Sequence, residues 1–128
     1  YDKLPGYRQC EYVTRELPHL MAMADVVVSR AGATALSEFL ALRKPMVLIP
    51  LSLKTSRGDQ LKNAQSFAQN GYAEVLTEER LTGEELVRTV NGVYEQREAY
   101  IENMNRQARQ DAACAVIDII RQLAAQKR

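Results

Sequence analysis

The chain has 128 residues, which is about the length of one domain and enough to bury a hydrophobic core of its own. Its 17 basic and 16 acidic residues give a formal net charge of +1, so no chain-wide field favours nucleic acid or an acidic partner. No apolar run reaches the roughly 18 residues of a membrane span. Cys10 and Cys114 lack the spacing of a metal site and are expected to be reduced thiols.

The first residues, Tyr1 to Pro5, contain no initiator methionine and no helix or strand pattern. We therefore expect the chain to be a piece of a longer protein whose preceding elements are absent. A weak strand pattern covers Arg8 to Val13. A short helix with a proline near its start is predicted from Glu16 to Ala24.

Three further apolar runs predict strands, at residues 26–28, 46–49 and 72–76. The first two have the composition of strands buried on both faces, and the third is expected at a sheet edge. Helices are predicted between them, at 33–42 and 60–70. Strands that alternate with helices pair in parallel, and ligands bind at their carboxyl ends. The sequence thus predicts an α/β fold with a Rossmann-like parallel sheet of about four strands and flanking helices.

The last third of the chain is helical throughout, so we divide it into βα units over 1–81 and C-terminal helices over 82–128. A capping-box pattern opens a helix from Thr82 to about Val90. Two more helices are predicted, at 92–109 and 111–125. The final helix has an apolar face that should dock onto the sheet or onto a neighbouring domain, formed by Ala112, Ala113, Val116, Ile119, Ile120 and Leu123.

An apolar strand runs through a turn of small residues directly into a helix at residues 25–38. Gly32 lets the backbone turn tightly and lets a ligand approach. The first N–H groups of the helix, from Ala33 and Thr34, lack intrahelical acceptors and favour an anion. Glu38 lies one turn past Thr34 and can accept hydrogen bonds from a ribose diol. The competing interpretation is an ordinary βα turn, in which the glycine serves geometry alone.

A second polar cluster opens the helix after the strand at 46–49. Asp59, Gln60 and Asn63 combine carboxylate and carboxamide groups, which can donate to and accept from sugar hydroxyls. The competing interpretation makes Asp59 the N-cap of the helix and leaves Asn63 solvated. With the first turn, this cluster changes the predicted ligand from a phosphate to a nucleotide sugar.

Several short motifs occur in a fixed order along nearly the whole chain: Ser29 to Thr34, Ser37-Glu38, Lys44-Pro45, Ile49-Pro50, Asp59-Gln60, Asn63-Ala64 and Gly71-Tyr72-Ala73. Together they resemble the C-terminal, donor-binding domain of the MurG family, the N-acetylglucosaminyltransferases of peptidoglycan synthesis. The resemblance implies the truncated C-terminal half of a two-domain GT-B enzyme. It further implies an inverting hexosyltransferase at the cytoplasmic face of the bacterial plasma membrane, which moves GlcNAc from UDP-GlcNAc to undecaprenyl-diphospho-muramoyl-pentapeptide.

The same resemblance implies roles for individual residues. The diphosphate would lie at the backbone of Gly32, Ala33 and Thr34, and Glu38 would take the ribose hydroxyls. Gln60 and Asp59 would contact the GlcNAc hydroxyls, although one common form of the motif has two glutamines at these positions.

Three further positions complete the predicted donor site. Asn63 joins the sugar contacts, and the backbone of Val13 would read uracil. Arg30 has two interpretations, an ion pair under the loop or a phosphate contact. No metal or cofactor is implied, and no residue of this chain matches a catalytic position.

The predicted partners are UDP-GlcNAc and, through an absent N-terminal domain, the undecaprenyl-linked acceptor. No nucleic acid is expected. The chain alone is expected to transfer nothing, and the loss of its first strands should favour self-association. The alternative function is a stand-alone nucleotide-sugar-binding module or a subunit of another lipid-directed sugar transferase.

Overall fold

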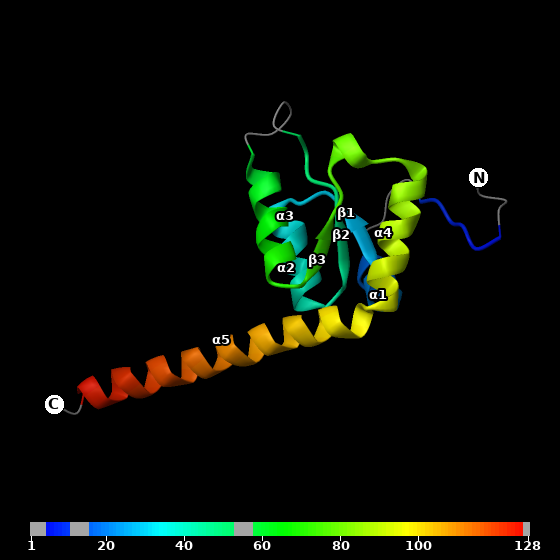
Figure 1. The fold of residues 1–128 in the computed structure, drawn as a ribbon. Helices are drawn as coiled ribbons and strands as arrows, with labels where there is room; N and C mark the ends of the chain where they lie inside the picture. Colours follow the sequence, from blue (N-terminus) through cyan, green and yellow to red (C-terminus); the bar gives the residue numbers. More distant parts are fainter. Residues whose placement is uncertain (1–4, 11–15, 53–57, 127–128) are drawn as a thin grey trace.

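The computed structural model describes residues 5–10, 16–52 and 58–126. Its centre is a three-stranded parallel sheet of β1 (Val27–Ser29), β2 (Met46–Leu48) and β3 (Ala73–Val75) in the order β1-β2-β3 (Figure 1). The α/β class and the parallel pairing predicted from the sequence are therefore confirmed.

Helices cover both faces of the sheet, with α2 and α3 on one side and α4 on the other (Figure 1). Their bounds are α1 Leu17–Met23, α2 Ala33–Ala41, α3 Asp59–Gln69, the 3-10 turn η1 Glu78–Arg80, α4 Gly83–Glu95 and α5 Arg97–Gln126.

The central strand β2 carries the core, because its three side chains are all fully buried. Side chains alternate across a strand, so Met46 and Leu48 pack with the core under α2 and α3 while Val47 packs with Val93 of α4. The four consecutive apolar residues at 46–49 therefore reflect a strand that is enclosed on both faces.

The first strand departs from the expectation of burial on both faces. Val28 pairs with Val47 and remains 44% exposed. In the described part of the chain β1 pairs with β2 alone, and α4 packs mainly against β2 and β3. Residues 8–10, the described part of the weak strand pattern, have no regular structure, and 11–15 lie outside the described residues. Three strands are therefore observed where about four were predicted.

The helix boundaries near the C-terminus differ from the prediction. Helix α4 continues through Gly92 to Glu95, and α5 then runs without a break to Gln126. The expected gap near residue 110 is absent, and one side-chain pair spans it, with Gln107 Nε2 donating to Asp111 Oδ1 at 2.9 Å. The capping box is confirmed in part, since the backbone N–H of Glu85 donates to Thr82 Oγ1 at 3.1 Å.

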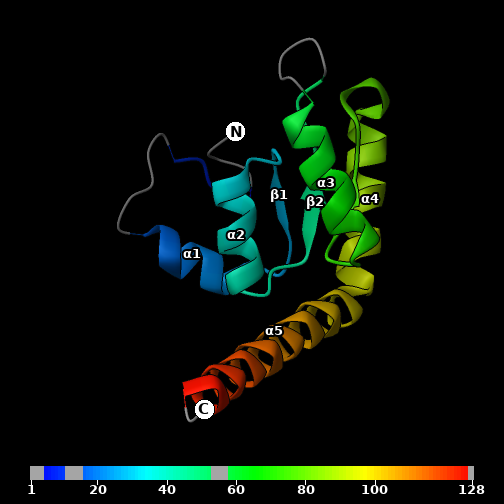
Figure 2. The ribbon, with the colours of Figure 1, turned by 90° about the vertical axis from the view of Figure 1, so that its left-hand side faces the viewer.

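Helix α5 begins against the amino ends of the strands and then projects away from the body (Figures 1 and 2). Met104 is buried in the core, whereas residues 109–126 are all exposed. The apolar face predicted to dock onto the sheet or onto a neighbouring domain does not dock onto the sheet, because Val116, Ile119 and Leu123 are each more than half exposed. Docking onto a neighbouring domain stays a prediction. Across the described residues, we find no helix both long enough and apolar enough to cross a membrane.

Candidate functional site

The turn between β1 and α2 leaves backbone N–H groups open at the carboxyl edge of the sheet. Gly32 is the N-cap of α2 with φ −72° and ψ 140°, and its carbonyl accepts the first helical bond from Leu36. The N–H groups of Ala33 and Thr34 therefore have no intrahelical acceptor. This φ is available to any residue, so a tight turn does not explain the glycine. A Cβ at Gly32 would meet no protein atom within 4 Å, which leaves this side of the turn accessible to a ligand.

Thr34 and Glu38 lie one turn apart on α2, and both are exposed. Within the described residues, no hydrogen bond or ion pair engages the Glu38 carboxylate, whereas the nearby Ser37 hydroxyl is occupied by the Ala33 carbonyl at 3.0 Å. A carboxylate without a protein partner, one turn from free N–H groups, can accept hydrogen bonds from a diol.

The start of α3 does not fit the capping interpretation of its polar cluster. Gly58 is the N-cap, with φ 87° in the left-handed region, and Asp59 is the exposed first residue of the helix. The capping role for Asp59 is therefore wrong. Asn63 is also not simply solvated, because its Nδ2 donates to the Ala31 carbonyl at 3.1 Å.

Gln60 and Asn63 tie α3 to the loops that follow the first two strands. Gln60 Oε1 accepts from the backbone N–H of Leu51 at 3.0 Å, while Asn63 holds the residue before Gly32. Among the described residues, the amide group of Gln60 and the Oδ1 of Asn63 have no other partner. Each carboxamide thus bonds the protein through one of its two polar atoms and leaves the other available to a ligand.

Arg30 forms the ion pair that was one of its two predicted roles. Its Nη1 lies 2.6 Å from Glu78 Oε1 and donates to the Ile49 carbonyl at 3.2 Å. Glu78 was missed by the sequence reasoning, because it stands 48 residues away and belongs to no motif. A phosphate contact of Arg30 stays a prediction. Val13 lies outside the described residues.

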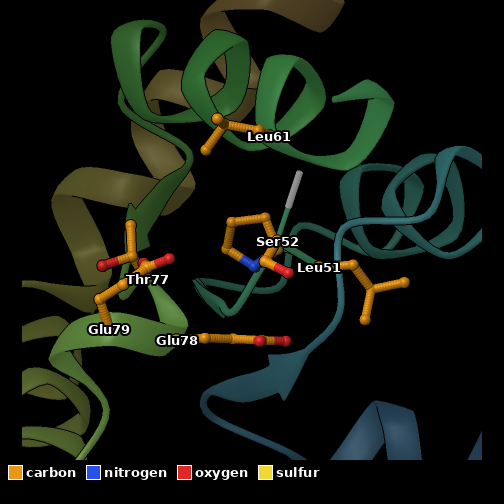
Figure 3. A pocket seen from close by; sticks show the side chains of 7 residues that line it. Leu51, Ser52, Leu61, Thr77, Glu78 and Glu79 are labelled. Atoms are coloured by element: carbon orange, nitrogen blue, oxygen red, sulfur yellow. The ribbon is translucent and has the colours of Figure 1, made fainter. Parts of the chain in front are cut away.

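A pocket of about 550 Å³ opens beside these groups (Figure 3). Leu61 of α3 borders it on one side, and Thr77, Glu78 and Glu79 after β3 border it on the other. The segment after β2 completes it with Pro50, Leu51 and Ser52. Within the described residues, no cluster of three or more His, Cys, Asp or Glu side chains is arranged to hold a metal ion.

Comparison with known proteins identifies the domain. The sequence model of the family described as "Glycosyltransferase family 28 C-terminal domain" matches residues 2–119. The chain belongs to this family.

The curated relatives of this family 28 domain carry the names of N-acetylglucosamine transferases. A protein of Geobacillus kaustophilus is 54% identical over 119 residues, and one of Clostridium tetani is 50% identical over 115. Both are named UDP-N-acetylglucosamine--N-acetylmuramyl-(pentapeptide) pyrophosphoryl-undecaprenol N-acetylglucosamine transferase. The matches cover 93% and 90% of this chain but only 33% and 32% of those proteins. The chain therefore spans about a third of the length of these relatives.

A solved structure described as the glycotransferase of kitacinnamycin is similar in fold to the family 28 domain, with a TM-score of 0.62 and 25% identity. The match covers 80% of this chain and 26% of that one. With the family match, it confirms the predicted resemblance to the C-terminal domain of a glycosyltransferase of the MurG type.

Proposed function

We propose that this chain is the donor-binding part of an inverting N-acetylglucosaminyltransferase that converts lipid I to lipid II in peptidoglycan synthesis. The relatives' names support the reaction class. The observation that carries the donor role is the open N-terminus of α2 with the Glu38 carboxylate one turn away, which has no partner in the described part of the chain. The proposal places the transfer reaction at the cytoplasmic face of the bacterial plasma membrane.

The donor would bind across the first turn of α2 and the first turn of α3. The diphosphate accepts hydrogen bonds from the N–H groups of Ala33 and Thr34, where the helix dipole favours negative charge. Glu38 accepts from both ribose hydroxyls. The free amide of Gln60 and the exposed carboxylate of Asp59 then contact the hydroxyls of GlcNAc.

In the proposed reaction, an acceptor hydroxyl attacks the anomeric carbon of GlcNAc from the face opposite UDP. The bond from that carbon to the diphosphate oxygen breaks, UDP leaves with the electron pair, and the acceptor proton passes to a base. Backbone N–H groups at a helix N-terminus stabilise the charge that develops on UDP, so this half of the site supplies leaving-group stabilisation. The lipid-linked acceptor and the base are assigned to the rest of the protein.

The test is calorimetric titration of the 128-residue chain with UDP, UDP-GlcNAc and UDP-glucose. A hydrogen bond to a charged group contributes about 1.5 to 3 kcal/mol, so Glu38→Ala should weaken UDP binding about tenfold or more. Glu95→Ala removes an exposed carboxylate at the far end of α4 and should leave the affinity unchanged. Equal UDP affinity in wild type and Glu38→Ala would remove the ribose role.

The same chain should form no lipid II when it is supplied with UDP-GlcNAc and lipid I, because it holds no assigned base or acceptor site. Product formation, followed by radiolabel transfer from UDP-GlcNAc into the lipid phase, would contradict this division of roles.

A further inference from the structure

We propose that Glu78 is a positioning residue for the donor-binding turn and that it acts through Arg30; this inference rests on the proposed function. Glu78 lies in η1, outside every predicted ligand contact. Its Oε1 receives Arg30 Nη1 at 2.6 Å, and the same nitrogen also donates to the Ile49 carbonyl at 3.2 Å.

The contact crosses the whole carboxyl edge of the sheet. Arg30 directly follows β1, Ile49 directly follows β2, and Glu78 comes three residues after β3. Neighbouring strands lie about 4.8 Å apart, so the Arg30 side chain extends over β2 to reach a carboxylate two strands away. One guanidinium group therefore links the ends of all three strands.

The turn begins at Arg30, and hydrogen bonds hold its first two residues in place. Arg30 is tied to Glu78, and the next residue, Ala31, is fully buried with its carbonyl bonded to Asn63 Nδ2. Gly32, which follows, has no protein atom near the position of a Cβ. The open residue thus lies between these two anchored residues and the first hydrogen bond of α2, which the N–H of Leu36 donates to its carbonyl. Its position sets where the N–H groups of Ala33 and Thr34 lie.

The ion pair also fixes where the positive charge of Arg30 lies. The Arg30 guanidinium donates to groups that follow β2 and β3, whereas α2 begins after β1. Glu78 therefore holds the cation over the β3 side of the edge and leaves anion binding at the turn to backbone N–H groups. Arg30 keeps the turn in place under this arrangement and does not serve as a ligand.

The test measures UDP affinity of the full 128-residue chain in a double-mutant cycle of Glu78→Ala and Arg30→Ala. Each single variant should raise the Kd for UDP about two- to fivefold, since an exposed ion pair can transmit no more. The double variant should be no weaker than the weaker single variant, because the two side chains act as a unit. Glu84→Ala, which removes an exposed carboxylate from the first turn of α4, should bind UDP as wild type does.

A second measurement requires no ligand. Backbone 15N relaxation should give order parameters near 0.85 for Ala31 to Ala33 in wild type and lower values in Glu78→Ala. Thermal unfolding should change little, since both side chains are partly exposed, which separates positioning from general stability.

Three results would overturn the inference: unchanged order parameters in Glu78→Ala, additive effects of the two substitutions on the UDP affinity, or tighter UDP binding once Glu78 is removed. If wild type fails to bind UDP while the order parameters still fall in Glu78→Ala, the donor function is wrong and the link from Glu78 to the turn remains.

Discussion

Replacing Gly71 by alanine should destabilise the domain more than any other glycine-to-alanine change that the structure allows us to evaluate. Gly71 ends α3 with φ 78°, in the left-handed region. Its N–H donates to the Ala68 carbonyl, and the next N–H, of Tyr72, donates to the Phe67 carbonyl. This is the Schellman pattern, and the rings of Phe67 and Tyr72 add the hydrophobic contact that accompanies it, 5.5 Å apart and edge to face.

The magnitude has two parts. An alanine in the left-handed region costs about 1 to 2 kcal/mol. Its Cβ would also collide with Nδ2 of Asn103, the atom that donates to the Gly71 carbonyl at 3.0 Å. Displacing that bond costs about 0.5 to 1.5 kcal/mol. The sum is a loss of about 1.5 to 3.5 kcal/mol, and a domain of this size should melt about 6 to 13 °C lower.

The assay is urea unfolding followed by the fluorescence of the six tyrosines, one of which, Tyr72, lies at the centre of the motif. Gly92→Ala is the matched control: it lies inside α4 with open space at its Cβ position, so alanine there should stabilise by about 0.5 to 1 kcal/mol. Combining Gly71→Ala with Asn103→Ala should cost little more than Gly71→Ala alone, because the first substitution already displaces the Asn103 bond and the backbone strain persists. A Gly71→Ala chain within about 0.5 kcal/mol of wild type would refute this account.

Three further outcomes are expected. Burial, and next the charge of Asp111, raise the pKa of the Tyr72 hydroxyl above 10.0 in the folded chain. The stability that this shift contributes is complete below pH 10 and is lost as the pH rises through the pKa of the folded state. Tyr72→Phe should therefore flatten the decline of the unfolding free energy at alkaline pH. Sedimentation velocity should show weaker self-association of the chain in Ile119→Glu and Ile120→Glu than in wild type. Arg106→Glu, a control exposed on the same helix, should weaken self-association less. EDTA should leave the UDP affinity unchanged, and a loss of binding that Mg²⁺ restores would contradict a metal-independent donor site.

Local chemistry made much of the fold predictable. Strand β2 follows from an unbroken apolar run between two prolines, and the end of α3 follows from Gly71. The break between α4 and α5 was misplaced because Gly92 was taken as a helix start. A glycine inside a helix costs only about 1 kcal/mol, which the packing of Val93 in the core offsets.

The candidate site was predictable where single turns define it, as at Gly32 and Glu38, and less so where distant groups meet. Asp59 is a favourable N-cap by composition, but Gly58 takes that position with a left-handed backbone. The Arg30 to Glu78 pair joins loops after different strands, and no periodicity in the sequence encodes such a contact. The second uses of Gln60 and Asn63, as ties to neighbouring loops, were hidden for the same reason.

The long helix α5 affects how the stability of this domain should be read. At 30 residues it contributes a large share of the helical signal, yet Met104 is its last buried residue. Residues 109–126 of this helix are all exposed, and helices held mainly by propensity fray over a broad temperature range. A far-ultraviolet melt will therefore superimpose gradual fraying on the cooperative loss of the core. A free energy of unfolding is defined only for a two-state transition, so it should be measured with probes inside the core.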